Sequence, residues 1–275
     1  MRVLISVDME GIAGVSYAGE VSHAGPEYTR FRRLMTDEAN AAVRGAFDAG
    51  ADSVVVNDSH NGMRNVMYEV LDDRVELISG YNKPLGMMEG VAGADAAIGI
   101  GYHAWAGTAR ATLDHTISSA QIHNLWLNGE HVGEPQLNAA LAAHYGVPLV
   151  MVSGDDKLAR QIAETLPGTR AVIVKHALDA TAVRTLPRRD VYTLIRQGAK
   201  DAVANRHLSP LKTVHPPVTF QVEFKRSSQA EVASLLPVVT RIGARIVEVT
   251  GHDMVEGFRM VKGLMRLAST ADIRS

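Results

Sequence analysis

The chain has 275 residues, and its 28 Lys and Arg against 30 Asp and Glu give a formal net charge of −2. This near-neutral balance offers little electrostatic attraction for nucleic-acid phosphates or an anionic membrane surface, so we expect neither as a partner. Hydrophobic residues make up 46% of the sequence and charged residues 21%, which is typical of globular proteins and excludes disordered or fibrous ones. Cysteine is absent, so any transition metal must be bound by His, Asp or Glu.

The start of the sequence predicts a cellular location. The short apolar run at residues 3–7 is followed at once by Asp8 and Glu10, which leaves no room for the apolar core of a signal peptide. We therefore expect a cytoplasmic protein. No apolar run approaches the roughly 20 residues that span a bilayer, so we expect no membrane segment.

Strands and helices alternate along the first two thirds of the chain. Short β-branched runs bounded by polar residues indicate strands, and apolar residues at helical spacing indicate helices. We predict strands at residues 3–7, 53–56, 75–79, 96–100, 122–127, 148–152 and 171–174, and helices at residues 27–48, 137–144 and 155–166. This alternation predicts an α/β fold with a mainly parallel sheet flanked by helices.

The pattern changes after residue 186. A long helix and a proline-containing linker come first, and then strands and helices alternate once more. We predict a helix at residues 189–205, strands at 219–224 and 245–249, and helices at 229–236 and 253–267. We interpret this tail as a smaller C-terminal βαβα unit, and divide the chain into a metal-binding catalytic α/β domain at residues 1–186 and a smaller α/β region at residues 187–275.

Carboxylates and imidazoles follow the ends of the predicted strands. Asp8 and Glu10 come after the first strand, and residues two apart in an extended chain point the same way, so both carboxylates face one space. His60 follows the second strand, His103 follows the fourth, and Glu134 precedes a helix. Ligands of parallel sheets bind beyond the carboxyl ends of the strands, so we expect these five side chains to converge there.

Such a cluster without cysteine suits zinc, and manganese or cobalt less specifically. Asp8, Glu10 and Glu134 bring three negative charges. Two divalent ions would leave a net charge of +1, which is enough to hold a bridging hydroxide. Hydrolases often use two metals about 3.5 to 4 Å apart in this way. The sequence therefore predicts a two-metal hydrolytic site.

Each residue also has an ordinary structural interpretation. Asp8 and Glu10 fit a solvated turn or a helix cap, and His60 fits a turn. His103 fits a flexible loop between glycines, and Glu134 fits the start of its helix. The coincidence of all of them at one edge of the sheet favours the metal site.

Asp58 stands two residues before His60. A carboxylate in this position can accept a hydrogen bond from the free N–H of a ligating imidazole and orient the ring. It can equally be a turn residue, and the sequence leaves both interpretations open.

Several short motifs occur in a specific order. They are SVDMEG at residues 6–11, NDSH at 57–60, GYHA at 101–104, the surroundings of His115, and VGE at 132–134. In this series the chain resembles the DppA-type zinc D-aminopeptidases nearly from end to end.

The resemblance implies a dizinc aminopeptidase assembled as a homodecamer, with its active sites facing an internal chamber. It also implies a role for each matching residue. Asp8 bridges both zinc ions, Glu10 and His103 bind one ion, and His60 and Glu134 bind the other.

The resemblance further implies a catalytic role for His115, as a nucleophile. A hydroxide activated by two metals makes direct attack by an imidazole redundant. The role of His115 therefore stays open between nucleophile and general acid or base.

The function that we predict is removal of the N-terminal residue, a D-amino acid by the resemblance, from short peptides or amino-acid amides. The ligands alone do not determine handedness, because two metals polarise the carbonyl of either enantiomer equally. Another dizinc amidase or deacylase is the first alternative, since the same ligands serve it. A non-catalytic protein that binds a metal or a small molecule is the second.

Overall fold

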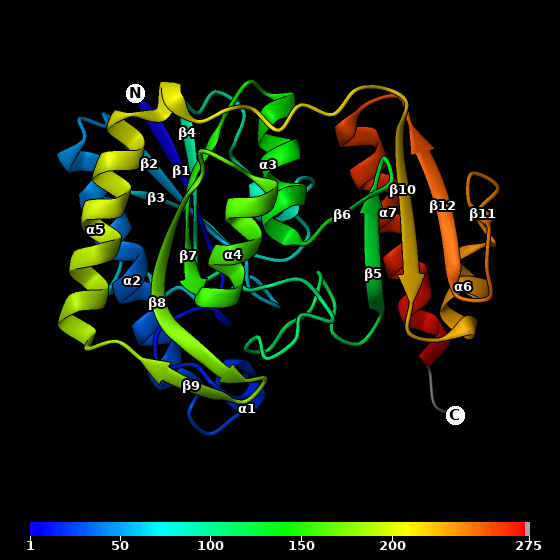
Figure 1. The fold of residues 1–275 in the computed structure, drawn as a ribbon, viewed down its shortest axis with the longest axis horizontal. Coiled ribbons are helices and arrows are strands. Elements are labelled where there is room, and N and C mark those ends of the chain that lie inside the picture. Colours follow the sequence, from blue (N-terminus) through cyan, green and yellow to red (C-terminus); the bar gives the residue numbers. More distant parts are fainter. Residues whose placement is uncertain (273–275) are drawn as a thin grey trace.

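Seven strands form the central sheet of the larger part of the molecule (Figure 1). The computed structural model describes residues 1–272. Neighbouring strands are parallel except for the last pair, which is antiparallel. In spatial order the strands are β3 (Glu76–Ile78), β2 (Ser53–Asp58), β1 (Arg2–Val7), β4 (Ala96–Ile100), β7 (Leu149–Asp155), β8 (Arg170–Asp179) and β9 (Ala182–Thr185).

Helices cover both faces of this sheet, because successive side chains of each strand point to opposite faces and both sets are apolar. In β1, Val3 and Ile5 share a core with Phe31, while Leu4 shares the opposite core with Leu137. One face is covered by α2 (Tyr28–Asp48) and α5 (Arg188–Ala204), and the other by α3 (Glu134–His144) and α4 (Asp156–Thr165).

A second sheet of five antiparallel strands lies beside the first (Figure 1). Its apolar face, which includes the fully buried Phe220 and Phe224, packs under α7 (Met254–Ala268). Helix α7 also contacts α3, so it joins the two parts of the molecule. In spatial order the strands are β11 (Thr240–Arg241), β12 (Ile246–Gly251), β10 (Val218–Phe224), β5 (Ile122–Leu127) and β6 (Glu130–His131).

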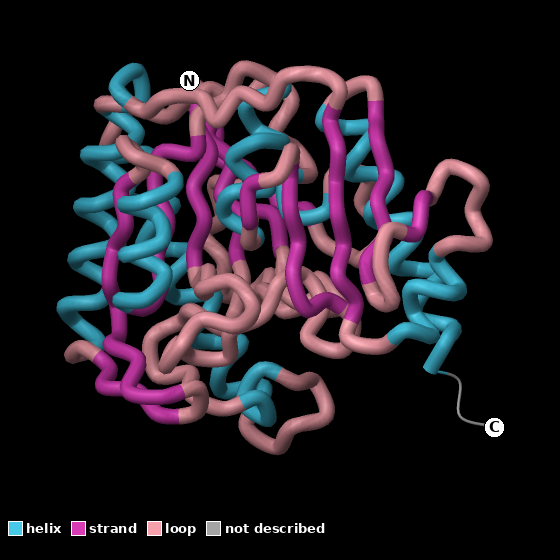
Figure 2. The backbone as a smooth tube through the Cα atoms, turned by 45° about the vertical axis from the view of Figure 1, so that its right-hand side comes forward, coloured by secondary structure: helices cyan, strands magenta, loops and turns pink. Residues whose placement is uncertain are grey.

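Loops and short helices gather at the carboxyl ends of the parallel strands, in the lower half of Figure 2. The short elements of the chain are α1 (Ala18–Val21), α6 (Ser227–Ala233) and the 3₁₀ turns η1 (Gly86–Met88), η2 (Arg206–Leu208) and η3 (Ser269–Asp272). The connection between β4 and β5 holds no regular element over residues 101–121. So long a loop in an ordered domain is typical of a functional site.

The predicted α/β class and the mainly parallel sheet are confirmed, and the tail does contain strand, helix, strand and helix in that order. Three details differ. Helix α3 begins at Glu134, three residues before the predicted start, because Pro135 is well suited to a first helical turn. Strand β8 continues to Asp179 and turns back into β9, a short polar strand that the sequence pattern does not reveal.

Segments from both sides of residue 187 contribute to each part of the molecule. Strands β5 and β6 come from the middle of the sequence yet belong to the second sheet, and α5 packs on the first sheet although it follows residue 187. The boundary at residue 187 stays a prediction. Within residues 1–272, no helix is both long enough and apolar enough to cross a membrane.

Candidate metal centre

Three neighbouring strands bring the predicted ligands to one edge of the sheet. The order β2-β1-β4 is parallel, and the register pairs Val7 with both Asp58 and Ile100. The three strands therefore end at the same level. The residues that follow them, Asp8, His60 and His103, start from adjacent points at this edge.

The loops after β1 and β4 cross at backbone contact. The Asp8 amide donates to the Ile100 carbonyl at 2.7 Å, and the Gly11 amide donates to the Gly101 carbonyl at 2.7 Å. Gly101 has a φ of +71°, and a Cβ there would lie 2.2 Å from the Asp8 carbonyl oxygen. Only glycine permits both this conformation and this approach.

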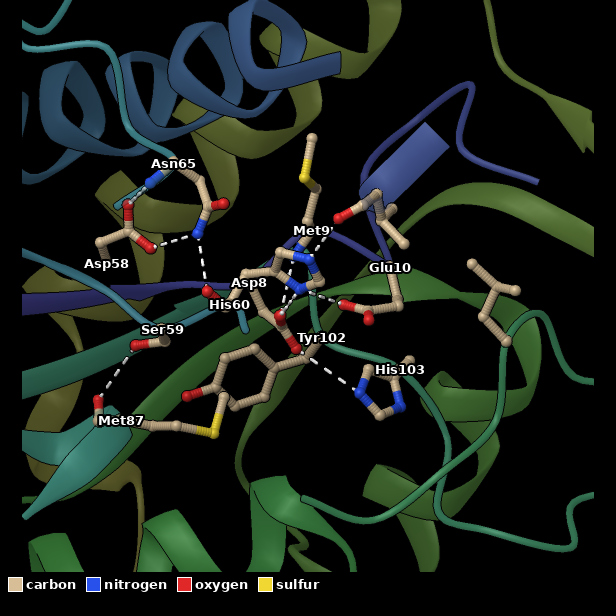
Figure 3. A network of polar contacts seen from close by, with 12 residues as sticks. Asp8, Met9, Glu10, Asp58, Ser59, His60, Asn65, Met87, Tyr102 and His103 are labelled. Atoms are coloured by element: carbon tan, nitrogen blue, oxygen red, sulfur yellow. Dashed lines mark hydrogen bonds and ion pairs between the residues drawn. The ribbon is translucent and has the colours of Figure 1, made fainter. Parts of the chain in front are cut away.

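Asp8 lies at the middle of the cluster (Figure 3). Its Oδ1 is 3.2 Å from His60 Nδ1, and its Oδ2 is 3.5 Å from His103 Nε2. His60 Nδ1 is also 2.9 Å from Glu10 Oε2, and His103 Nε2 is 3.4 Å from Glu134 Oε2. All five side chains are buried. The structure thus brings together every residue that we predict as a metal ligand.

Carbonyl oxygens orient the imidazoles. His60 Nε2 lies 2.8 Å from the Val21 carbonyl, and His103 Nδ1 lies 3.0 Å from the carbonyl of Ala104. A carbonyl can only accept a hydrogen bond, so the nitrogen beside it carries the hydrogen. In the neutral ring the other nitrogen then presents its lone pair to the cluster, as a metal ligand must.

His115 adds a third imidazole at this site. Its Nε2 is 3.8 Å from Glu134 Oε1, and its ring stacks on that of His103 with centroids 4.1 Å apart. Its Nδ1 lies 2.9 Å from the Leu113 carbonyl, which leaves Nε2 free to accept a proton. The Leu113 amide in turn donates to the Ala180 carbonyl in the β8–β9 turn, so this turn helps to hold the loop that carries His115.

The donor set fits a bound cation. Glu10 Oε2 and His103 Nε2 are buried, yet neither makes a hydrogen bond. Glu10 Oε2 is close to His60 Nδ1, but the pair lacks hydrogen-bond geometry. Donor atoms that face one another in this way are typical of ligands around a common ion. Two groups of side chains could each hold an ion, because the ligand atoms within each group lie within 4.8 Å of one another. One group is Asp8, Glu10 and His103, and the other is His103, His115 and Glu134.

The electrostatics point the same way. Burial and the charge of Glu10 raise the pKa of Asp8 to about 8. Burial opposes a charge on His103, but Glu134 and Asp8 together outweigh it and raise the pKa of His103 to about 10. Burial likewise opposes a charge on His60, and Glu10 and Asp8 raise its pKa well above the usual value. Without a cation, protons on the imidazoles balance the carboxylates, and a divalent ion would replace those protons.

Asp58 holds the turn after β2 and does not contact the His60 ring. Its carboxylate accepts hydrogen bonds from the Asn65 side chain at 2.8 Å and from the Val66 amide at 2.6 Å. Asn65 also donates to the His60 carbonyl at 2.7 Å. Of the two open interpretations, the turn residue is the one that the structure supports, and the Val21 carbonyl takes the place of the expected carboxylate.

A buried hydrogen-bond network that we did not predict joins the segments that carry the candidate ligands. The Tyr102 hydroxyl donates to Ser6 Oγ at 2.8 Å and accepts from Asn138 at 2.9 Å, and Ser6 Oγ lies 2.8 Å from Ser59 Oγ. All four residues are buried, and Ser59 and Tyr102 directly precede His60 and His103 in the sequence. Ser6, Ser59 and Tyr102 belong to the motifs SVDMEG, NDSH and GYHA, and this membership was the available signal for them.

Lys175 of β8 is a further residue that sequence patterns do not reveal. It is fully buried, and its Nζ donates to the carbonyls of Glu10 at 2.5 Å, Ile12 at 3.1 Å and Val15 at 2.7 Å. Burial lowers its pKa to about 8. Three donors matched by three carbonyls fix the loop that carries Glu10. Glu38 of α2 holds the same loop by accepting from the Ala13 amide at 2.8 Å.

A cavity of about 640 Å³ opens beside the cluster. Glu10, His60, His115 and Glu134 line it together with Asp8. Its other walls include η1, the β8–β9 turn, helix α7 and the loop that carries His115. This volume is typical of sites for small ligands.

The fold and the site together define a class of protein with a cluster of candidate metal ligands in a cavity at the edge of a parallel sheet. Residues 1–263 match the family described as D-aminopeptidase, peptidase family M55. The chain belongs to this family.

Two comparisons cover the whole chain. The sequence is 35% identical over 271 residues to a D-aminopeptidase of Bacillus subtilis (strain 168), with 98% of each chain covered. The fold is similar to the solved structure of the zinc-dependent D-aminopeptidase DppA from Bacillus subtilis, described as a self-compartmentalizing protease. That similarity has a TM-score of 0.96 at 33% identity and covers 100% of both chains.

Replacing Lys175 with Met tests whether this side chain positions Glu10. The substitution leaves three buried carbonyls without their donor, so we expect a loss of about 1–3 kcal/mol in the free energy of unfolding and weaker zinc binding. Thermal unfolding and a zinc-binding titration measure the two effects. Lys200→Met, at an exposed position of α5, is the matched control. A Lys175→Met protein that equals the control in both measurements would contradict the positioning role.

Proposed function

We propose that this protein is a zinc-dependent aminopeptidase that holds two zinc ions per chain and removes an N-terminal D-residue from short peptides or amino-acid amides. The observation that carries the proposal is the convergence of five buried carboxylates and imidazoles on one point beside a cavity. The full-length match to the D-aminopeptidase family supports the reaction, and the zinc dependence of the Bacillus subtilis structure supports the metal.

Asp8, Glu10, His60, His103 and Glu134 would hold the zinc ions. Asp8 suits the bridging position, because its two oxygens face different histidines. The distribution of the other four ligands between the two ions stays a prediction. Zinc at this place supplies positive charge that polarises the scissile carbonyl and favours the deprotonation of water.

His115 suits the transfer of protons. Its Nδ1 is engaged with the Leu113 carbonyl, its Nε2 is free, and its side chain remains 16% exposed at the cavity wall. We propose that Nε2 accepts the proton of the attacking water and delivers it to the nitrogen of the leaving group. This role needs no covalent bond between the ring and the substrate.

The preference for a D-residue rests on the shape of the cavity, because the ligand set treats the two enantiomers alike. Leu113 and Ile117 flank His115, and both have positive φ angles, of 51° and 59°. Residues other than glycine rarely adopt this conformation, and those that do are held in it by the surrounding structure and are concentrated at functional sites. We infer that this part of the cavity wall contributes to the handedness of the site.

We also propose that the protein assembles as a homodecamer whose active sites face an internal chamber. The support is the self-compartmentalizing character described for the Bacillus subtilis structure, whose fold the chain shares over its full length. A sedimentation experiment that returns a monomer would contradict the chamber. The cytoplasmic location remains a prediction.

Reconstitution of the metal-free protein tests the proposed function. We expect about two equivalents of zinc per chain, loss of activity with a chelator and its return with zinc. Against matched D- and L-aminoacyl amides, we expect cleavage of the D-series and poor cleavage of the same compounds with acetylated amines. Preference for the acetylated compounds would instead identify a deacylase. Tight zinc binding with no turnover of any compound would identify a metal-binding protein.

Replacing His115 with Ala tests its part in the reaction. Loss of a general acid or base lowers kcat by about a hundredfold to ten-thousandfold, and we expect this loss with the zinc content unchanged. His123→Ala, at an exposed position of β5, serves as the control. Near-normal turnover would remove His115 from the mechanism, and loss of zinc would make it a ligand.

The protonation of the metal-free site predicts a pH dependence of zinc binding. Asp8 and His103 must lose their protons to act as ligands, and their pKa values of about 8 and about 10 place that loss above neutrality. Zinc affinity therefore rises with pH, by at least about tenfold between about pH 6 and about pH 8. Calorimetric titrations at pH 7 in buffers of different ionisation enthalpy would show proton release. Heats independent of the buffer would contradict this prediction.

A further inference from the structure

Strand β7 ends in a short polar motif, SGDD at residues 153–156, that contains none of the candidate metal ligands. The strand ends at Asp155 and helix α4 begins at Asp156, with no loop between them (Figure 1). Ser153 and Asp155 are buried. Buried polar side chains need hydrogen-bond partners, and here several of the partners lie in the long loop between β4 and β5.

Ser153 and Gly154 hold the start of that loop. The Ser153 hydroxyl accepts from the Gly101 amide at 3.1 Å, and the Ser153 carbonyl accepts from the Tyr102 amide at 2.9 Å. A Cβ on Gly154 would lie 2.2 Å from the Tyr102 carbonyl oxygen, so only glycine allows this approach. The end of β7 is therefore in backbone contact with the segment that leads to His103.

Asp155 uses its two carboxylate oxygens for different segments. Its Oδ1 accepts from the amides of Lys157 at 3.0 Å and Leu158 at 2.8 Å, and so caps the first turn of α4. Its Oδ2 accepts from the Thr112 amide at 3.1 Å, three residues before His115. A serine or an asparagine caps a helix about as well as an aspartate does, so the cap alone does not require the second oxygen.

Asp156 reaches the same loop through the hairpin of β8 and β9. Its Oδ1 accepts from the Ala177 amide of β8 at 2.8 Å. The Ala180 carbonyl, in the turn of this hairpin, accepts from the Leu113 amide at 3.0 Å. The hairpin therefore connects Asp156 to the residue that follows Thr112.

The two connections meet at the residues that orient His115. The Leu113 carbonyl lies 2.9 Å from His115 Nδ1, and the amides of Thr112 and Leu113 are the groups that Asp155 and the hairpin hold. Leu113 has a φ of 51°, a conformation that persists only where the surrounding structure holds the backbone. These two hydrogen bonds help to hold it, and they keep the Leu113 carbonyl in place for the His115 ring.

We propose that Asp155 and Asp156 are positioning residues that hold the His115 ring in place beside the metal centre. This inference rests on the proposed function, in which His115 transfers protons. Both aspartates act through backbone amides and not on the substrate. A general base works only when its nitrogen lies within hydrogen-bond reach of the proton that it removes. A displaced ring therefore slows the chemical step and leaves substrate binding almost unchanged.

Asp155→Asn separates the contact with the loop from the helix cap. Its amide oxygen can still accept from Lys157 and Leu158, but the amide nitrogen in place of Oδ2 cannot accept from the Thr112 amide. With a D-aminoacyl amide and the zinc-loaded enzyme, we expect kcat to fall by about tenfold to a hundredfold at nearly constant KM. Asp73→Asn, at an exposed turn between β2 and β3, is the matched control. A kcat equal to that of the control would overturn the role of Asp155.

A double-mutant cycle distinguishes positioning from a general structural role. If Asp155 acts through His115, then Asp155→Asn has no further effect on kcat in a protein that already carries His115→Ala. The same fractional loss with and without His115 would mean that the two residues act independently. That result would overturn the positioning role.

Zinc affinity controls for the neighbouring Lys175. The register of β7 and β8 pairs Asp155 with Lys175. Burial lowers the pKa of Lys175, and the carboxylate of Asp155 opposes this effect. Lys175 holds the loop that carries Glu10, so a loss by this route would weaken zinc binding. We expect Asp155→Asn to bind zinc as tightly as the control does, and a loss of kcat that disappears at saturating zinc would overturn the proposal.

Two variants test Asp156. Asp156→Ala removes the acceptor of the Ala177 amide, and we expect kcat to fall as it does in Asp155→Asn. Asp156→Asn keeps an oxygen for this amide but loses the ion pair with Lys157, whose Nζ lies 2.6 Å from Asp156 Oδ2. We expect this variant to recover most of the activity. Equal losses in both variants would assign the effect to the ion pair and overturn the role of Asp156.

Hydrogen exchange separates this inference from the proposed function. If the unmodified protein cleaves no substrate, or if His115→Ala keeps normal turnover, the proposed function fails in that part. Exchange of the amides of residues 112–115, followed by mass spectrometry, then decides whether Asp155 holds the loop. Faster exchange in Asp155→Asn than in Asp73→Asn would support the contact, and equal exchange would overturn it.

Discussion

The rest of the structure depends on one electrostatic constraint, the burial of three carboxylates at a single point. Asp8, Glu10 and Glu134 come from different segments, and each is almost fully removed from water. Such a cluster is stable only if positive charge lies among the carboxylates. His60 and His103, which face the carboxylates, supply this positive charge when they are protonated. Bound metal ions would supply it in their place. The crossing of the loops at Gly101 and the register of β1, β2 and β4 keep the carboxylates and the histidines next to one another.

The sequence predicts this site well because the candidate residues can be recognised from their immediate neighbours in the chain. Asp8, Glu10, His60 and His103 follow strands whose apolar runs are plain, and parallel strands must end at one edge. Glu134 differs, because it opens helix α3. The same reasoning places Asp8 and Glu10 on one side of the chain, as the structure confirms. Motif order adds the family, which the full-length match confirms.

What the sequence does not predict depends on contacts between distant segments. Lys175 looks like any polar residue at a strand, and only the tertiary fold shows its three carbonyl partners in the loop after β1. The sequence pattern suggests that β5 belongs with the parallel sheet. Its partner is β10, which lies about ninety positions later in the chain. Lys262 and Arg266 follow an ordinary helical pattern, so nothing in their sequence shows that they line the cavity.

The ammonium of Lys175 also sets an order of events during biosynthesis. It reaches back 165 positions to the Glu10 carbonyl, so the segment that carries Asp8 and Glu10 leaves the ribosome long before Lys175 does. A nascent chain that ends before β8 contains all five candidate ligands but lacks the side chain that fixes the loop after β1. The loop that carries Asp8 and Glu10 therefore reaches its braced geometry only after β8 has been synthesised.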